Sequence, residues 1–202
     1  MGPKPRRNSF ETSDGRLVTL RSLNPLDTRA ILEFANALYD EKRANRDLGL
    51  VAFDRQPTVA EEREFLSEIV RGRKRNEVVS VAALHGKRLV GHCDIRRGTR
   101  EDVMHAGTLG IAVLRGYRGV GVGEKLTNEA LMQARQAGIW LVQLTVFANN
   151  SVATGLYRKT GFRKAGVIPN KMARDGRRFD EVIMYIDLRG IDKSTSRGRR
   201  KS

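Results

Sequence analysis

Residues 115–126 read RGYRGVGVGEKL and place three glycines at alternate positions, Gly119, Gly121 and Gly123. The stretch follows an apolar run and precedes a helical pattern. Backbone N–H groups can close on an anion only where no Cβ intervenes, and the N-terminus of a helix adds partial positive charge. The stretch therefore predicts a phosphate-binding loop at the start of a helix.

Two common nucleotide-binding loops do not fit these residues. A P-loop requires a lysine followed by serine or threonine, whereas Lys125 is followed by Leu126. A dinucleotide-binding loop requires an acidic residue ~20 positions further on for the ribose. The sequence has no acidic residue between Glu129 and Asp175, so both interpretations fail on a specific residue.

A second motif lies downstream, where residues 150–162 read NSVATGLYRKTGF. Together with the pattern Arg118-x-x-Gly121-x-Gly123, this block resembles the GNAT superfamily of N-acetyltransferases over residues 17–188. The resemblance implies a mixed α/β fold whose central, mostly antiparallel sheet is flanked by helices and splayed between its fourth and fifth strands. It also implies that the glycine loop holds the pyrophosphate of coenzyme A.

The pattern of apolar residues predicts the element order βααβββαβαββ. Strands are expected over 16–23, on either side of a Gly86-Lys87 turn within 77–97, and over 103–113, 139–146, 162–167 and 178–188. Helices are expected from Asn24 to about 42, from Thr58 to about 73, from Gly121 to about 137, and over 150–160. Asn24 is a plausible N-cap, and Thr58 with Glu61 forms a capping box.

The resemblance implies a set of cofactor-binding residues. In the fourth strand, backbone groups would lie against the pantetheine arm and hold the thioester carbonyl, and the loop would bind the pyrophosphate. The implied residues are Ile111, Ala112, Val113, Arg118, Gly119, Val120, Gly121, Val122, Gly123, Asn150 and Tyr157. Seven basic residues and no acidic ones lie between Glu129 and Asp175, which favours binding of a polyanionic cofactor.

Tyr157 is the candidate general acid that protonates the departing thiolate, since a phenol of pKa ~10 can serve a thiol of pKa ~8.5. The alternative is a tyrosine that only packs against a helix face. Asn150 either binds the pantetheine or caps the helix that follows, and the two roles are compatible.

Several residues are candidates for the general base. Many relatives carry a glutamate near the position of Thr108, and threonine cannot accept a proton at neutral pH. We favour His105, acting through water, over a polar strand-edge role for this residue. His92 shares a strand face with Asp94, and the resemblance places Glu41 in the substrate mouth. Cys93 and Trp140 are expected in the core.

Composition limits the class of protein. The chain has 202 residues, a formal net charge of +15 and one cysteine, without an apolar stretch long enough to span a membrane. We expect one N-acetyltransferase domain over 17–188, a flexible basic segment over 1–16 and a disordered basic tail over 189–202. The tails either contact nucleic acid or a ribosome, or are merely solvated. The single cysteine and the lack of a secretory signal favour a cytoplasmic protein.

These observations predict an enzyme that moves an acetyl group from acetyl-CoA directly to a primary amine of a protein, at a lysine or the N-terminus, or of a small molecule. The alternative is a non-catalytic coenzyme A-binding module of the same fold, docked on nucleic acid or a ribosome by its basic tails. No metal is expected. The protein is expected to be a monomer or a homodimer.

Overall fold

The computed structural model describes residues 8–45 and 54–189. The strands are β1 (Asn8–Glu11), β2 (Leu17–Arg21), β3 (Val78–His85), β4 (Arg88–Arg97), β5 (Ala106–Val113), β6 (Leu141–Phe147), β7 (Arg163–Arg174) and β8 (Arg177–Asp187). The helices are α1 (Thr28–Ala44), α2 (Val59–Lys74), α3 (Val122–Gln136) and α4 (Ser151–Lys159). Short 3₁₀ turns are η1 (Pro25–Asp27), η2 (Glu101–Val103) and η3 (Arg115–Tyr117).

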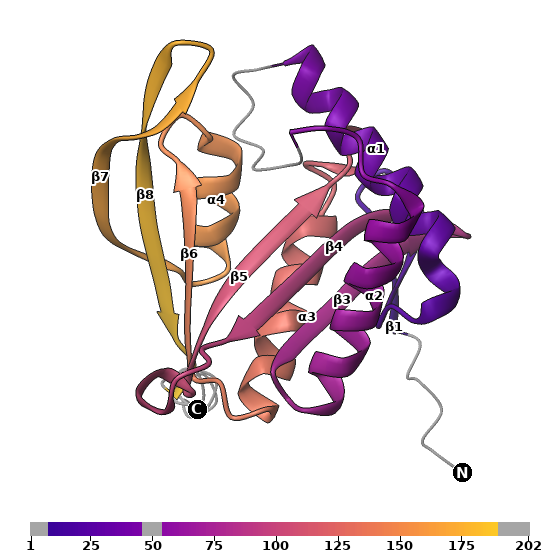
Figure 1. Ribbon diagram of the computed structural model, residues 1–202, viewed down its shortest axis with the longest axis horizontal. Coiled ribbons are helices and arrows are strands. Elements are labelled where there is room, and N and C mark those ends of the chain that lie inside the picture. The colour runs from indigo at the N-terminus through magenta and orange to yellow at the C-terminus, as the bar shows by residue number, and fades with distance from the viewer. Residues whose placement is uncertain (1–7, 46–53, 190–202) are drawn as a thin grey trace, which may run out of the picture.

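The strands form one sheet in the order β1-β2-β3-β4-β5-β6-β8-β7. Helices α1 and α2 cover one face of its first half, and α3 covers the opposite face (Figure 1). Apolar side chains of the sheet pack against both layers, and Val18, Ile95, Leu126 and Ile139 are among the most deeply buried. The predicted mixed α/β fold is confirmed.

The predicted splay lies between β5 and β6, the one parallel pair of the described sheet. Only three residue pairs join these strands: Ala106 with Leu141, Gly107 with Val142, and Thr108 with Gln143. Beyond them the strands diverge, as Figure 1 shows. From Leu109 onward β5 is therefore paired with β4 on one edge, while no strand of the described residues pairs with its other edge.

The N-terminal segment corrects one expectation. Residues 8–11, predicted within a flexible segment over 1–16, form β1 and pair with β2 in antiparallel register. Phe10 packs against the core, and Thr12 is buried in the turn that joins the two strands. Strand pairing together with this burial orders a segment whose short, polar sequence carries no strand signal of its own. Residues 1–7 lie outside the described residues.

Two further boundaries differ from the prediction. β5 begins at Ala106 rather than 103, because Glu101–Val103 forms a 3₁₀ turn. β7 continues through Pro169, which was expected in a loop. β7 is an edge strand with an irregular register between Ile168 and Met172, where a residue without an N–H is tolerated.

Both predicted N-caps are confirmed. The Asn24 side chain accepts from the backbone N–H of Leu26, and Thr58 and Glu61 form the capping box at the start of α2. Asn24 caps the 3₁₀ turn η1, and α1 proper begins at Thr28. Among the described residues, no helix combines the length and hydrophobicity that crossing a membrane requires.

Candidate cofactor and active site

The glycine loop lies between the end of β5 and the start of α3. Gly119 and Gly121 have φ of +75° and +96°, a region that side chains rarely adopt. A Cβ built on either residue would meet nothing within 4 Å. Open space beside the backbone, next to the N-terminus of a fifteen-residue helix, is the arrangement that an anion needs.

Gly123 has a different role from the other two glycines. Its φ is not positive, and a Cβ there would lie 3.1 Å from Cδ2 of Leu156 in α4. A side chain at Gly123 would therefore crowd Leu156 where α3 and α4 meet, and the space beside Gly123 is not open as it is beside Gly119 and Gly121. Two other members of the loop are also held by the protein: Val122 is fully buried, and the carbonyl of Val120 accepts from the N–H of Ser13 at 3.2 Å.

Arg118, predicted to bind the cofactor, is engaged within the protein. Its Nε donates to the carbonyl of Val113 at 2.7 Å, and its guanidinium pairs with Glu41 at 2.6 Å. Glu41 also accepts from the backbone N–H of Arg115 at 2.8 Å. Glu41 lies within α1, and its carboxylate ties that helix to the glycine loop. The contact depends on residues 74 positions apart in the chain, which local sequence patterns cannot reveal.

Ile111, Ala112 and Val113 lie at the end of β5, on the splayed side of the sheet. Val113 is buried, and Ile111 and Ala112 are half-buried and contact the core. Their backbone pairs with His92, Cys93 and Gly91 of β4 on one edge. Within the described strands the opposite edge has no partner, so this edge can accept an added extended chain.

Tyr157 lies in α4, which follows β6 in the chain and lies beside β6 in Figure 1. The residue is only 7% exposed, and its ring packs against Phe162 with centroids 5.8 Å apart. Burial raises the pKa of the phenol well above its ordinary value, with a smaller contribution from Cys93 of β4. Tyr157 and Cys93 belong to the same cluster of buried residues. At neutral pH the hydroxyl is protonated and can donate a proton.

Asn150 caps α4. Its Oδ1 accepts from the N–H of Ala153 at 3.0 Å. The helix is nine residues long, so this cap contributes to holding the element that carries Tyr157. The predicted contact with pantetheine would have to use the side-chain amide N–H groups.

His105 lies away from the glycine loop and from the Ile111–Val113 end of β5. His105 precedes β5 at the end where β5 and β6 are still paired, roughly 25 Å of extended strand from Val113. Its ring stacks on Trp140 at 4.1 Å, and the Arg189 guanidinium lies 3.8 Å from the Trp140 ring centre. Trp140, expected in the core, is half-buried in this stack. The base role of His105 remains a prediction that this placement does not support.

The other candidate bases lie on the face covered by α1 and α2. His92 is buried against Phe65 and bonds Ser80 Oγ at 2.9 Å, and burial lowers its pKa. Asp94 pairs with Arg96 at 3.0 Å. Cys93 is fully buried, as expected, and burial raises its pKa.

Glu62 of α2 is a carboxyl that sequence reasoning did not select. The residue is 3% exposed, and burial raises its pKa to about 7. Its place in the sequence, one residue after the capping-box glutamate at the start of an amphipathic helix, resembles an ordinary surface position. The contacts of the described residues do not join Glu62 to Tyr157 or to the glycine loop.

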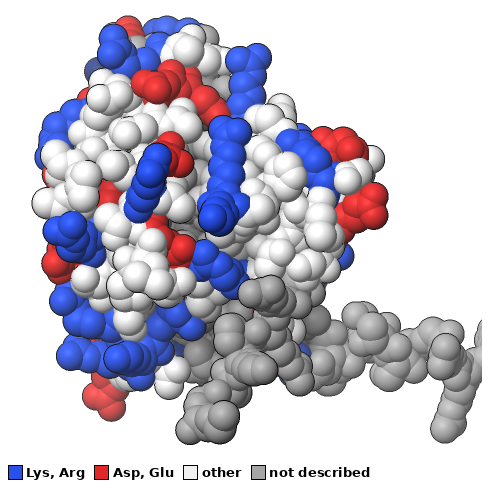
Figure 2. Space-filling view, turned by 90° about the vertical axis from the view of Figure 1, so that its right-hand side faces the viewer, with Lys and Arg blue, Asp and Glu red and all other residues white. Residues whose placement is uncertain are grey.

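On the face drawn in Figure 2, charged side chains lie in several groups. Figure 2 shows Lys and Arg side chains over one face with Asp and Glu between them. No group of His, Cys, Asp or Glu in 8–45 and 54–189 could hold a metal ion. The predicted basic tail over 189–202 lies outside the described residues except for Arg189, which pairs with Asp187.

Comparison with known proteins places this geometry in a family. The acetyltransferase (GNAT) family matches residues 36–162. The N-alpha-acetyltransferase RimI of Mycobacterium tuberculosis is 30% identical over 77% of this chain and 85% of its own length. An L-methionine sulfoximine/L-methionine sulfone acetyltransferase of Pseudomonas aeruginosa is 29% identical over 45% of this chain and 51% of its own.

Among solved structures, RimJ of Mycobacterium smegmatis, in complex with CoA-disulfide, superposes with a TM-score of 0.71. It is 16% identical, and the alignment covers 93% of this chain and 88% of that one, so the likeness concerns the fold. The chain spans about half the length of the first curated relatives that it matches. Because the family match covers more than half of the 202 residues, the chain belongs to the acetyltransferase (GNAT) family.

Proposed function

We propose that the protein is an N-acetyltransferase that moves an acetyl group from acetyl-CoA directly to a primary amine. The observation that carries the proposal is the loop at Gly119 and Gly121. Both glycines adopt positive φ and have open space beside them. They lie at the N-terminus of α3, next to the unpaired edge of β5. A phosphate on the loop and an extended arm along β5 would together accommodate coenzyme A.

The chain's own residues have distinct roles in this proposal. Backbone N–H groups of the loop bind the pyrophosphate, and backbone groups at Ile111–Val113 align the pantetheine arm and the thioester carbonyl. Acetyl-CoA supplies the activated acetyl group. Tyr157 donates the proton that the departing thiolate needs, and Asn150 holds the helix that positions Tyr157. The amine must lose a proton, and we assign no residue to that step.

The acceptor belongs to one of two classes. The relatives are named for a small amino-acid analogue, L-methionine sulfoximine, and for protein α-amines, and this chain has similar identity to both. The match to the protein N-alpha-acetyltransferase covers far more of the two chains, so we favour a protein or peptide amine as the acceptor. The non-catalytic alternative is less favoured because the open space beside Gly119 and Gly121 and the protonated phenol of Tyr157 support an enzyme.

The test is coenzyme A binding by calorimetry with matched glycine variants. A side chain at positive φ costs about 1–2 kcal/mol wherever it is placed. We therefore compare Gly119→Ala and Gly121→Ala with Gly176→Ala, which has φ of +74° and equally open surroundings at the tip of the β7–β8 hairpin. We expect at least tenfold weaker binding for the two loop variants and an unchanged Kd for Gly176→Ala. Wild-type affinity in both loop variants would remove the proposed role of the loop.

A further inference from the structure

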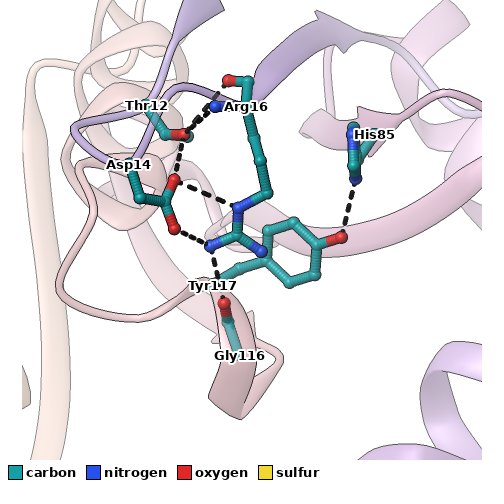
Figure 3. Close-up of polar contacts among 6 residues, drawn as sticks. All are labelled: Thr12, Asp14, Arg16, His85, Gly116 and Tyr117. Atoms are coloured by element: carbon teal, nitrogen blue, oxygen red, sulfur yellow. Dashed lines mark hydrogen bonds and ion pairs between the residues drawn. The ribbon is translucent and has the colours of Figure 1, made fainter.

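The turn of the N-terminal hairpin contacts the glycine loop. Arg16 directly precedes β2, and its guanidinium lies 4.0 Å from the centre of the Tyr117 ring and donates to the carbonyl of Gly116 at 2.8 Å (Figure 3). Three residues earlier in the same turn, the N–H of Ser13 donates to the carbonyl of Val120. These contacts join residues about one hundred positions apart.

Arg16 is also held within the hairpin turn itself, by Asp14 and Thr12. Asp14 accepts from Nε of Arg16 at 3.1 Å and pairs with its terminal nitrogen as well. Hydrogen bonds from Arg16 and Thr12 lower the pKa of the Asp14 carboxyl to about 2, so this partner is ionised at any physiological pH. The Thr12 hydroxyl closes the turn by accepting from the N–H of Arg16 at 3.0 Å. Two fixed bonds orient the planar guanidinium over the ring.

Tyr117 is also fixed from its other end. The residue is 7% exposed, and its hydroxyl lies 2.8 Å from Nδ1 of His85 at the end of β3. Figure 3 shows the ring between Arg16 on one side and His85 at its hydroxyl. The segment that leads into the glycines is thus supported through Tyr117 by the turn of the N-terminal hairpin and by β3, and through Glu41 by α1.

These contacts matter because Gly119 and Gly121 have no side chains that could hold the loop in one conformation. The space beside each glycine is open. A loop that must be ordered when its ligand binds loses affinity, whereas a loop held in the binding conformation does not pay this entropy. The N-terminal hairpin holds residues 116–120 at both ends, by Arg16 at Gly116 and by Ser13 at Val120.

We propose that Arg16, oriented by Asp14 and stacked on Tyr117, is a positioning residue for the coenzyme A-binding loop, so that the N-terminal hairpin is part of the cofactor site. The proposal rests on the proposed function. It assigns Arg16 no contact with the cofactor. Arg16 raises the affinity for coenzyme A and acetyl-CoA. It does not change the affinity for the amine or the rate of the chemical step.

The experiment compares Arg16→Ala with Arg29→Ala in the full chain. Arg29 is an exposed arginine with one carboxylate partner, Glu33 at 2.9 Å, on α1 and away from the loop. Calorimetry with coenzyme A and steady-state kinetics with acetyl-CoA are measured for both, with melting temperatures. We expect Arg16→Ala to raise the coenzyme A Kd and the acetyl-CoA KM by about three- to tenfold. The amine KM and kcat should stay within twofold, and Arg29→Ala should match wild type.

A merely structural role for Arg16 would lower the melting temperature and leave the Kd of the folded protein unchanged, and that result overturns the proposal. If Arg16→Ala does not fold, Arg16→Lys decides, because lysine keeps the charge and the stem but loses the fork that reaches Gly116 and Asp14 together. A wild-type Kd for Arg16→Lys then overturns the proposal as well. Failure of the wild-type protein to bind coenzyme A would instead remove the proposed function, and this inference with it.

Discussion

Tyr157 concentrates the chemistry proposed for this site in one hydroxyl. The side chain is buried, and no described residue forms a hydrogen bond with its hydroxyl. Because burial raises the pKa of the phenol, the neutral form persists well beyond the pH range of ordinary assays. Tyr157 is therefore suited to donate a proton and unsuited to accept one.

Tyr157→Phe should lower kcat by about 10²–10⁴-fold with little change in acetyl-CoA affinity, because the ring is kept and only the proton donor is lost. Since Tyr157 stays protonated, the loss should be the same from pH 6 to pH 9. Steady-state kinetics across that range check both statements. Tyr185→Phe, which removes an exposed hydroxyl on β8, is the matched control. Turnover of Tyr157→Phe within a few-fold of wild type would leave Tyr157 a packing role alone.

Individual residues show what the sequence could and could not predict. Three alternating glycines were recognisable as a loop, but their spacing could not separate the positive φ of Gly119 and Gly121 from the close approach of Gly123 to Leu156. Arg118 matched a motif, yet its partner Glu41 comes from another element. Such roles depend on contacts between distant segments, which no local pattern contains.

At the scale of elements, local signals succeeded where they were strong. Helix caps and apolar periodicity located every helix of the described residues to within a few positions. β1 was missed because Asn8–Glu11 has no strand pattern and is ordered by pairing with β2. The extension of β7 beyond Pro169 was missed because an edge position, which tolerates proline, is a property of the sheet.

α4 is the element on which the site depends most, because it is short and carries Tyr157. Asn150→Ala should lower the free energy of unfolding by about 0.5–2 kcal/mol through loss of the cap. Asn150→Asp should retain that stability, since the carboxylate can accept from the N–H of Ala153 as Oδ1 does. Denaturant unfolding of both variants measures the difference.

The same pair separates the two roles suggested for Asn150. If the amide N–H groups also bind the pantetheine, Asn150→Asp will raise the acetyl-CoA KM although it folds like wild type. An acetyl-CoA KM equal to that of wild type in Asn150→Asp would restrict Asn150 to capping the helix.

At the scale of the whole molecule, the positive charge is the least explained property. The formal net charge is +15, and residues 190–202 carry five basic residues against Asp192 alone. On the face in Figure 2, Lys and Arg side chains of the described residues lie in several groups with Asp and Glu among them. We therefore propose the C-terminal segment as the site of a nonspecific nucleic-acid contact.

Deleting residues 190–202 should weaken nucleic-acid binding and flatten its salt dependence, because each neutralised phosphate releases counterions with a slope of roughly −0.9 per contact on duplex DNA. The rate of acetylation of a short peptide should not change. DNA and RNA affinities at several salt concentrations, for the full and shortened chains, measure the effect. An unchanged slope in the shortened chain would assign any such binding to the folded domain.

The strand order has a consequence for how the chain is made. From β1 to β6 each new strand joins the edge left by the one before it, so the sheet can grow as the ribosome releases the chain. The last step breaks this order, since β8 lies between β6 and β7. β7 pairs with β8 and with no other described strand, and must wait for it. A nascent chain stalled after β7 would therefore display an unfilled β6 edge, open to chaperones or to another nascent chain, until β8 emerges and completes the sheet.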